Sequence, residues 1–253
     1  LIDIHDLNVE MVSFTDNNDK FHKKGYKPKD KDTLEKLLKR MIEVRGDEGD
    51  FNDIDTSNIE SMESLFNDNK TFNGDITGWN VSKVINMSYM FCDAKSFNQD
   101  ISKWKFPIVE NMSCMFWGAT SFNQPIGGWK FPNVIDMSMY FYKATSFNQP
   151  IGKWEFPNVT DVSGMFMEST SFNQPIGNWK FPNVENMNCM FYDATSFNQP
   201  IGDWEFPNVK SMSYMFSGAT SFNQDLSKWD LSKKEKLGIF DGCPIKDEYK
   251  PKM

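Results

Sequence analysis

The sequence lacks long apolar runs, histidine-rich motifs and a cysteine framework. The 253-residue chain contains no run of 18 or more apolar residues, so we expect no transmembrane segment. Its two histidines, His5 and His22, fit neither a metal-ligand nor a catalytic-triad pattern. We therefore predict that the protein is not an enzyme and has no catalytic residue and no cofactor. The four cysteines follow no disulfide pattern, which predicts free thiols and excludes a disulfide-stapled secreted scaffold.

Positive charge is also scarce. The chain has 27 lysines and arginines against 35 aspartates and glutamates, for a formal net charge of −8. This balance argues against a nucleic-acid partner, which requires a clustered basic face. The densest acidic stretch contains Asp47, Glu48, Asp50, Asp53 and Asp55, but its glycine and distal glutamate are misplaced for a calcium-binding EF-hand loop. We interpret it as a solvated acidic loop and predict no metal site.

The sequence does have a strict period. Seven tryptophans stand 25 residues apart, at Trp79, Trp104, Trp129, Trp154, Trp179, Trp204 and Trp229. A phenylalanine opens a Phe-Asn pair at the same interval, at Phe72, Phe97, Phe122, Phe147, Phe172, Phe197 and Phe222. A fixed period of about 20–50 residues is typical of a solenoid, in which one supersecondary unit is copied along an axis. Because an aromatic side chain buries about 150–250 Å², these columns predict a continuous core.

Within one repeat, the residue order predicts a strand followed by a short helix. Trp129 and Phe131 are two residues apart and share one face of a strand, which Pro132 would end. Residues that favour helix N-caps then recur at Asn86, Asn111, Asp136, Asp161, Asn186 and Ser211. Helical spacing follows at Met87, Met90, Phe91 and Ala94. We therefore predict an α/β repeat, with parallel strands on one face and short helices of about two turns on the other.

The flanks of the repeats predict caps. Residues 32–45 are expected to form a helix, because Asp32 and Glu35 make a capping box, apolar residues follow at helical spacing and Gly46 is placed to end it. Such a helix would cover the first coil, since solenoid ends require a cap with a polar outer face. We divide the chain into an N-terminal segment with this capping helix (1–50), a solenoid of about eight coils (51–240) and a C-terminal tail (241–253).

The repeat resembles a known family. Asn86–Phe91 reads Asn-Met-Ser-Tyr-Met-Phe, and Ala94–Gln99 with Trp104 completes a pattern similar to BspA-like leucine-rich-repeat surface proteins and to the repeats of Mycoplasma-type lipoproteins. The resemblance covers about residues 26–240. It implies a right-handed leucine-rich-repeat-like solenoid displayed on a cell surface, with adhesion as the usual suggestion, and it brings no catalytic residues. No signal or lipobox is visible, and the start at Leu1 rather than Met indicates a fragment or a processed product.

One repeated column is expected to be structural. Asparagines recur at Asn73, Asn98, Asn123, Asn148, Asn173, Asn198 and Asn223. A side-chain amide at the same place on each coil can satisfy backbone groups of the neighbouring coil. We therefore predict an asparagine ladder along the stack.

Two surfaces are candidates for function. If the predicted helices form, two of their positions point outward and place aromatic and methionine side chains in a stripe: Tyr89, Trp117, Met139, Tyr142, Met167, Tyr192 and Tyr214. These side chains either pack sideways on neighbouring helices or contact another protein, where such residues are enriched. The strand face carries a basic set, Lys103, Lys105, Lys130, Lys153 and Lys180, which is either merely solvated or an electrostatic docking surface.

The sequence favours an interaction module over an enzyme. We expect a non-enzymatic solenoid that binds another protein, on a cell surface or outside the cell, although a cytoplasmic location remains open. The alternative is a structural spacer or a self-assembling component of a larger surface array or particle. The partner would then be a second copy of this chain, bound through the same stripe.

Overall fold

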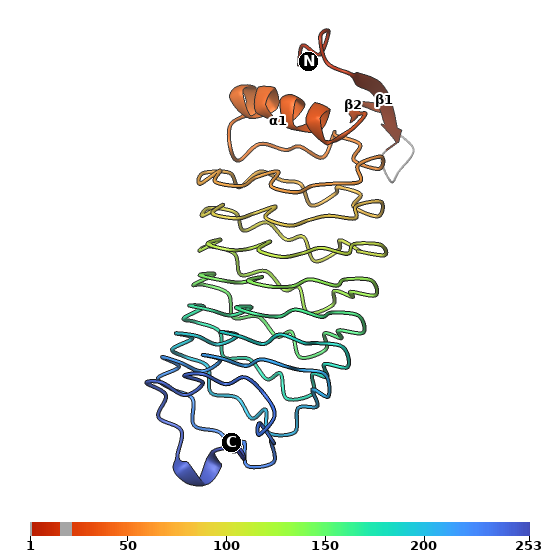
Figure 1. Cartoon of the computed structure of the whole chain (residues 1–253). Coiled ribbons are helices and arrows are strands. Elements are labelled where there is room, and N and C mark those ends of the chain that lie inside the picture. Colours follow the sequence, from red (N-terminus) through yellow and green to blue (C-terminus); the bar gives the residue numbers. More distant parts are fainter. Residues whose placement is uncertain (1, 16–21) are drawn as a thin grey trace.

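The computed structural model describes residues 2–15 and 22–253, and the side chains of residues 2–13 and 24–253. A two-stranded antiparallel sheet of β1 (Val9–Thr15) and β2 (His22–Pro28) precedes helix α1 (Lys31–Arg45). From there the chain winds into a stack of similar coils that extends from α1 to the C-terminus (Figure 1). A short 3-10 helix, η1 (Asp247–Tyr249), lies in the tail.

The coils contain neither the strands nor the helices that the repeat predicts. Isolated parallel bridges join equivalent residues of successive coils, such as Asn86 with Asn111 and Asn111 with Asp136. Between α1 and η1 the described chain forms no helix and no extended strand. The expected right-handed, leucine-rich-repeat-like α/β solenoid, with parallel strands on one face and short helices on the other, is therefore wrong. The 25-residue repeat builds a stack of turns.

The segment predicted to be helical in each coil is a ribbon of overlapping turns. We call it the turn ribbon; it comprises residues 62–69, 87–94, 112–119, 137–144, 162–169, 187–194, 212–219 and 236–242. In the second of these, the N–H groups of Met90, Cys92 and Ala94 close turns onto carbonyls three residues earlier. Tyr89 and Asp93 have φ values of 58° and 54°, whereas a helix requires φ near −63° at every residue. These two left-handed positions exclude the helix.

Hydrogen bonds between coils explain why the turns are preferred. In the same ribbon, alternate N–H groups donate to carbonyls of the next coil: Tyr89 to Ser113 at 3.0 Å and Phe91 to Met115 at 2.9 Å. A helix would direct these donors to its own carbonyls, and the coils would lose these hydrogen bonds to one another. A left-handed residue other than glycine costs on the order of 1 kcal/mol, a cost that the hydrogen bonds between coils offset.

The residues predicted to be helix N-caps, at the start of each turn ribbon, make a capping hydrogen bond although no helix follows. The side chain of Asn86 accepts from the backbone N–H of Ser88 at 2.9 Å, and Asp136 accepts from Ser138 at 2.8 Å. This is an Asx-turn, the same bond that a helix N-cap makes to its second helical residue. The sequence signal for a cap is thus common to helices and turns, and it does not distinguish between them.

The asparagine ladder is present as predicted. The backbone N–H of Asn123 donates to the side-chain oxygen of Asn98 at 3.0 Å, and that of Asn148 donates to Asn123 at 3.0 Å. The same contact joins every successive pair from Asn73 to Asn223. Each ladder side chain therefore satisfies one backbone donor of the following coil.

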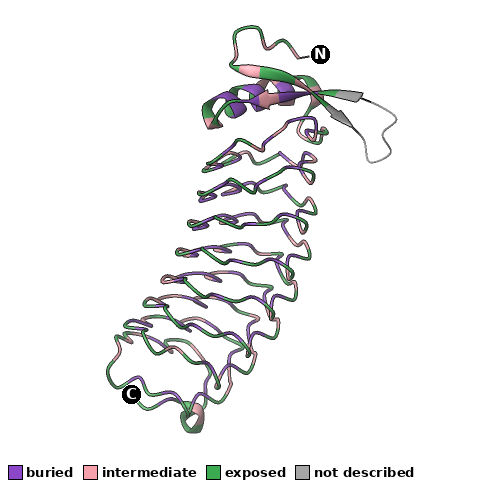
Figure 2. Cartoon of the chain, turned by 90° about the vertical axis from the view of Figure 1, so that its right-hand side faces the viewer, coloured by how far each residue is buried: buried purple, intermediate pink, exposed green. Residues whose placement is uncertain are grey.

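Aromatic columns form the core. All seven repeated tryptophans are at most 5% exposed, as a core role requires. The ring of Trp154 stacks on that of Trp179, with centroids 6.3 Å apart and an interplanar angle of 2°. Phe116 stacks on Phe91 and Phe141 at 5.5 and 5.7 Å. Buried and exposed residues alternate along each coil (Figure 2), so the interior is one continuous column of rings.

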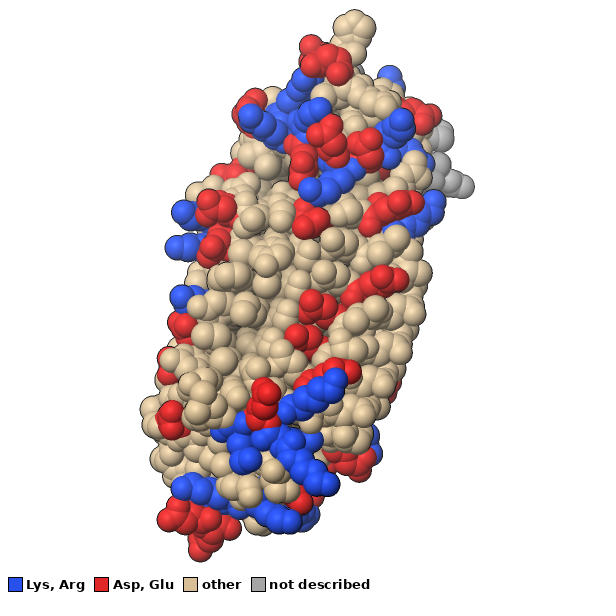
Figure 3. All heavy atoms as spheres, viewed as in Figure 1, with Lys and Arg blue, Asp and Glu red and all other residues tan. Residues whose placement is uncertain are grey.

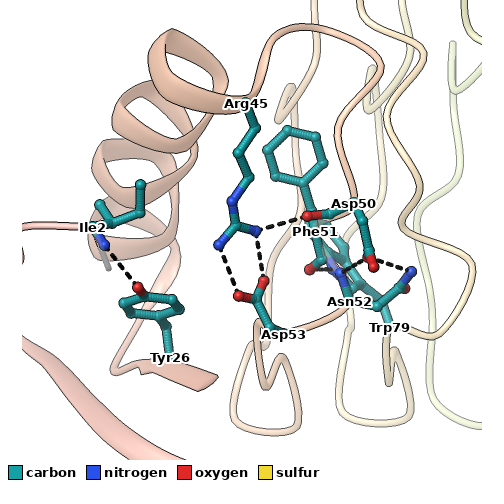
Figure 4. Close-up of polar contacts among 8 residues, drawn as sticks. All are labelled: Ile2, Tyr26, Arg45, Asp50, Phe51, Asn52, Asp53 and Trp79. Carbon is teal, nitrogen blue, oxygen red and sulfur yellow. Dashed lines mark hydrogen bonds and ion pairs between the residues drawn. The ribbon is translucent and has the colours of Figure 1, made fainter. Parts of the chain in front are cut away.

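The segment expected to be helical at 32–45 is α1, and it lies over the first coil (Figure 1). Leu34, Leu37 and Met41 on its inner face are fully buried. Arg45, in its last turn, holds the buried carboxylate of Asp53 with two bonds of 2.7 and 2.8 Å and donates to the carbonyl of Asp50 (Figure 4). Helix and first coil are thus joined by apolar packing and by a bidentate ion pair.

The C-terminal tail packs on the last coil rather than extending from it. The N–H of Leu226 donates to the carbonyl of Tyr249, Leu231 donates to Lys252, and Lys252 donates to Trp229. The N–H of Lys246 continues the asparagine ladder by donating to the side chain of Asn223 at 3.0 Å. The tail therefore covers the edge of the last coil along its tryptophan and asparagine segments.

Candidate functional site

The seven stripe residues all lie on the turn ribbons. Met139 and Tyr214 are 36% and 37% exposed, and the other five are partly exposed: Tyr89, Trp117, Tyr142, Met167 and Tyr192. The helical angles that suggested an outward stripe do not apply, because these segments are not helices. The side chains nevertheless reach the surface, since the inward positions of each ribbon are taken by the core methionines and phenylalanines.

Neighbouring stripe residues contact one another along the stack. The ring centroids of Tyr89 and Trp117 are 6.3 Å apart, and those of Trp117 and Tyr142 are 5.0 Å apart. The ammonium of Lys143 lies 5.0 Å from the centroid of the Tyr142 ring and 3.7 Å from the carboxylate of Glu168. The rings therefore pack sideways on each other, as one interpretation expects, and each still exposes part of its surface. Contact with another protein stays a prediction.

Left-handed backbone conformations position three of the seven stripe residues. Tyr89, Met139 and Tyr214 have φ values of 58°, 52° and 57°, and this conformation turns the side chain across the ribbon toward the next coil. Gly164 and Gly238 occupy the same column, and an added Cβ at Gly238 would lie 2.5 Å from the ring of Tyr214. Glycine at that position thus makes room for the tyrosine ring of the preceding coil.

Two titratable groups at one end of the stripe, Tyr89 and the neighbouring Cys92, have raised pKa values. Burial raises the pKa of the Cys92 thiol to about 12, with a further contribution from the nearby Asp93 carboxylate. A hydrogen bond to the thiol of Cys114 is the main cause that raises the pKa of Tyr89 to about 12. Both groups are therefore protonated at neutral pH, and a thiol in that form is a poor nucleophile. All four cysteines are free, as the sequence predicts.

The basic set lies on the tryptophan segments of the coils. Lys103, Lys105, Lys130, Lys153 and Lys180 are all exposed, and Lys105 separates the buried Trp104 from the buried Phe106. Lys180 pairs with Glu205 at 3.6 Å. A hollow of about 460 Å³ lies between Lys105 and Lys130, over the edges of Trp104 and Trp129. The structure brings these two lysines to one hollow and leaves Lys180 outside it.

The sequence pattern missed several exposed aliphatic side chains. Ile85, Ile108 and Ile135 are 41–45% exposed, and Leu237 is 68% exposed. Leu237 stands where six other coils have serine or asparagine (Ser88, Ser113, Ser138, Ser163, Asn188 and Ser213) and the first has Glu63. An apolar residue at a position that is polar in the other coils could have been noticed in the sequence. The last repeat is one residue shorter, however, so a fixed 25-residue step does not align Leu237 with that position.

The acidic stretch is occupied by internal contacts. Asp53 pairs with Arg45 at 2.7 Å, and Asp55 pairs with Lys27 at 3.3 Å. Among the described residues, no group of three or more histidine, cysteine or acidic side chains is placed to hold a metal ion. His5 is not part of any such group, and the side chain of His22 lies outside the described residues. Among the described residues, no helix is long and apolar enough to cross a membrane.

Fold and surface together define a repeat protein whose coils stack through backbone hydrogen bonds and aromatic columns. Two overlapping matches, over residues 34–154 and 135–246, assign the chain to one family. The protein belongs to the family described as "Mycoplasma protein of unknown function, DUF285". This is consistent with the BspA-like repeat pattern and does not confirm the leucine-rich-repeat classification. Neither a search of curated proteins nor a search of solved structures gave a match.

Proposed function

We propose that the protein is a non-enzymatic interaction module whose aromatic stripe contacts another protein. The observation that carries this proposal is the row of partly exposed rings and thioethers along consecutive turn ribbons, centred on Trp117 and Tyr142. Tryptophan, tyrosine and methionine are enriched at protein interfaces and depleted elsewhere on protein surfaces. A contiguous row of them on one face therefore favours a contact surface.

The stripe is suited to binding because it is already ordered. Backbone hydrogen bonds between coils hold each ribbon, and the ring of Trp117 lies against Tyr89 on one side and Tyr142 on the other. A partner therefore does not have to immobilise these side chains, which lowers the cost of association. Such anchors contribute most when they are central and become fully desolvated.

Display on a cell surface or secretion is part of the same proposal. It draws support from the BspA-like pattern of the repeats and from membership in a Mycoplasma family. The second candidate is a spacer or a component of a larger array, in which the stripe of one copy contacts that of another. The rigid, elongated stack supports this reading equally well, so the oligomeric state must distinguish the two.

The test compares two surface variants, each with two side chains replaced by serine. Trp117→Ser with Tyr142→Ser removes the centre of the stripe, and Lys105→Ser with Lys130→Ser removes the basic hollow on the tryptophan segments. Each protein is measured for binding to a panel of purified extracellular-matrix and cell-surface proteins by biolayer interferometry. Sedimentation velocity at micromolar and near-millimolar concentrations measures self-association.

We expect the stripe variant to lose binding at least tenfold while the lysine variant binds as the parent does. Both variants should melt within a few degrees of the parent, because all four side chains are at the surface. Loss of binding only in the lysine variant would assign the contact to the basic hollow. Concentration-dependent sedimentation that the stripe variant abolishes, without any binding in the panel, would assign the stripe to self-assembly.

A further inference from the structure

The last turn ribbon leaves one edge of the stack unpaired. In every earlier ribbon, alternate N–H groups donate to carbonyls of the following coil, as Met212, Tyr214, Phe216 and Gly218 do to residues 235–241. The corresponding donors of the last ribbon are Lys236, Gly238, Phe240 and Gly242. Among the described residues, none of these four N–H groups donates a backbone hydrogen bond. We call this row of donors the C-terminal edge.

The tail does not cover this edge. It pairs with Leu226, Asn223, Trp229 and Leu231, which lie on the other segments of the last coil. The edge also exposes apolar surface, because Leu237 is 68% exposed and Phe240 is only half-buried. The ring of Phe240 stacks on Phe216 at 5.8 Å, and no further ring of the described chain follows it. The last ribbon therefore offers both hydrogen-bond donors and an open end of the phenylalanine column.

Lysines outnumber acidic residues beside the edge, three against the two carboxylates of Glu235 and Asp241. Lys233, Lys234 and Lys236 flank it in sequence, and a basic cluster marks the corresponding end of the stack (Figure 3). Lys233 is exposed and has no ion-pair partner in the described chain, whereas Lys210, Lys228 and Lys252 each pair with a carboxylate of a neighbouring coil. Lysines on a sheet edge discourage pairing between identical copies, and they attract an acidic segment.

Hydrogen-bond polarity excludes the simplest self-association. Two C-terminal edges cannot pair with each other, because both would present N–H groups. The opposite end of the stack is covered by α1, whose Leu38 and Ile42 line a hollow of about 410 Å³ together with Leu65 and Phe66 of the first ribbon. A second copy that approached this end would therefore meet α1 beside the first ribbon.

We propose that the C-terminal edge binds an acidic, extended polypeptide segment of a partner protein. Alternate carbonyls of that segment accept from the four free N–H groups, as in the addition of a strand to a sheet edge. Its apolar side chains cover Leu237 and Phe240, and its carboxylates lie near Lys233 and Lys236. This surface adjoins the aromatic stripe only at Tyr214, whose ring lies beside Gly238. The centre of the stripe, at Trp117 and Tyr142, belongs to earlier coils, so variants there test the two sites independently.

The probe is an acetylated, amidated heptapeptide in which glutamate alternates with valine, and its control has lysine in place of glutamate. Hydrogen exchange read by mass spectrometry measures protection of the amides, and fluorescence anisotropy of a labelled peptide measures affinity. Lys233→Glu with Lys236→Glu reverses the charge at the edge. Lys103→Glu with Lys153→Glu makes the same change in net charge on the tryptophan segments and serves as the matched control.

We expect the acidic peptide to slow exchange at residues 236–242, and the lysine peptide to leave it unchanged. Charge reversal at the edge should weaken binding by about tenfold at low salt, and the Lys103/Lys153 control by less than about twofold. Leu237→Ser, which introduces the serine that five other coils have at this position, should also weaken binding while the charge stays constant. Melting curves confirm that each variant is folded.

Three results would overturn the proposal. Equal binding of the acidic and lysine peptides would show that charge plays no part. Protection elsewhere than residues 236–242 would place the segment on another surface. A dimer by sedimentation, with residues 236–242 protected in the absence of peptide, would make a second copy of this chain the occupant.

Discussion

Replacement of one central tryptophan should destabilise the whole stack. Trp154 is 2% exposed, stacks on Trp179 at 6.3 Å and meets the edge of Phe131 at 4.9 Å. Its indole N–H donates to the carbonyl of Ile126 at 3.1 Å. Trp154→Ala leaves a cavity, which costs on the order of 3–5 kcal/mol. The carbonyl of Ile126 also loses a buried donor, which is worth about 1 kcal/mol.

The terminal equivalent supplies an internal comparison. Trp229 is 3% exposed and contacts Trp204, Phe206 and Phe216, but its indole N–H has no hydrogen-bond partner among the described residues. Trp229→Ala should therefore cost about 1 kcal/mol less than Trp154→Ala, because no carbonyl loses its donor.

Urea unfolding followed by circular dichroism measures both changes, with the slope compared between variants to detect loss of cooperativity. A loss below about 1 kcal/mol for Trp154→Ala would refute the assignment of the tryptophan column to the core. Equal losses at both sites would refute the assigned role of the indole hydrogen bond.

Three further predictions concern the cap and the thiols. Arg45→Met should lower the free energy of unfolding by about 2 kcal/mol, because the buried Asp53 loses two charged hydrogen bonds. Lys36→Met on the exposed face of α1 is the control. An unchanged urea midpoint for Arg45→Met would contradict this prediction. Deletion of residues 31–45 should expose the apolar surface of the first coil and cause aggregation, and a truncated protein that stays monomeric in gel filtration would refute the capping role. The pKa of the Cys92 thiol is raised to about 12, above the unfolded value of about 8.5. The neutral thiol therefore contributes its full stability below pH of about 8.5, and this contribution is lost as the pH rises toward 12. Between pH 8 and pH 10, the urea midpoint of Cys92→Ala should fall less steeply than that of the parent protein.

Much of the molecule could be predicted from the period alone. The stacking of equivalent residues, the burial of the tryptophans and the asparagine ladder all follow from one fact: a residue repeated every 25 positions meets its own equivalents in the neighbouring coils. The helix at 31–45 was also predictable, because Leu34, Leu37, Leu38 and Met41 define its inner face without reference to the rest of the chain.

The local structure of each coil was not predictable from apolar spacing. Met87, Met90 and Phe91 face inward in a turn ribbon as they would in a helix, since both place inward residues three and four apart. Only the backbone conformation distinguishes a turn ribbon from a helix. The sequence marks the left-handed backbone positions with glycines at two equivalent places in the repeat: Gly164 and Gly238 align with Tyr89, and Gly118, Gly218 and Gly242 align with Asp93. Glycine favours positive φ, and tyrosine, cysteine and methionine in the same columns obscured that preference.

The candidate stripe was found for a reason that proved wrong in detail. Helical angles placed Trp117 and Tyr142 on the outside, whereas in the structure they lie in turn ribbons, each followed by a left-handed residue, Gly118 or Lys143. The C-terminal edge could not have been found from the sequence, because it depends on the direction in which the backbone donors of each ribbon point. That direction follows from the turn geometry, which a pattern of side chains does not encode.

The hydrogen bonds that join the coils run along the axis of the stack, which determines how the protein responds to mechanical force. A pull on the two ends loads the bonds of one coil interface at a time, so the stack should open coil by coil from its weaker end rather than rupture as a unit. Each 25-residue coil that opens releases roughly 80–90 Å of extended chain. A protein of this design placed between two surfaces would therefore lengthen in steps under load and remain attached.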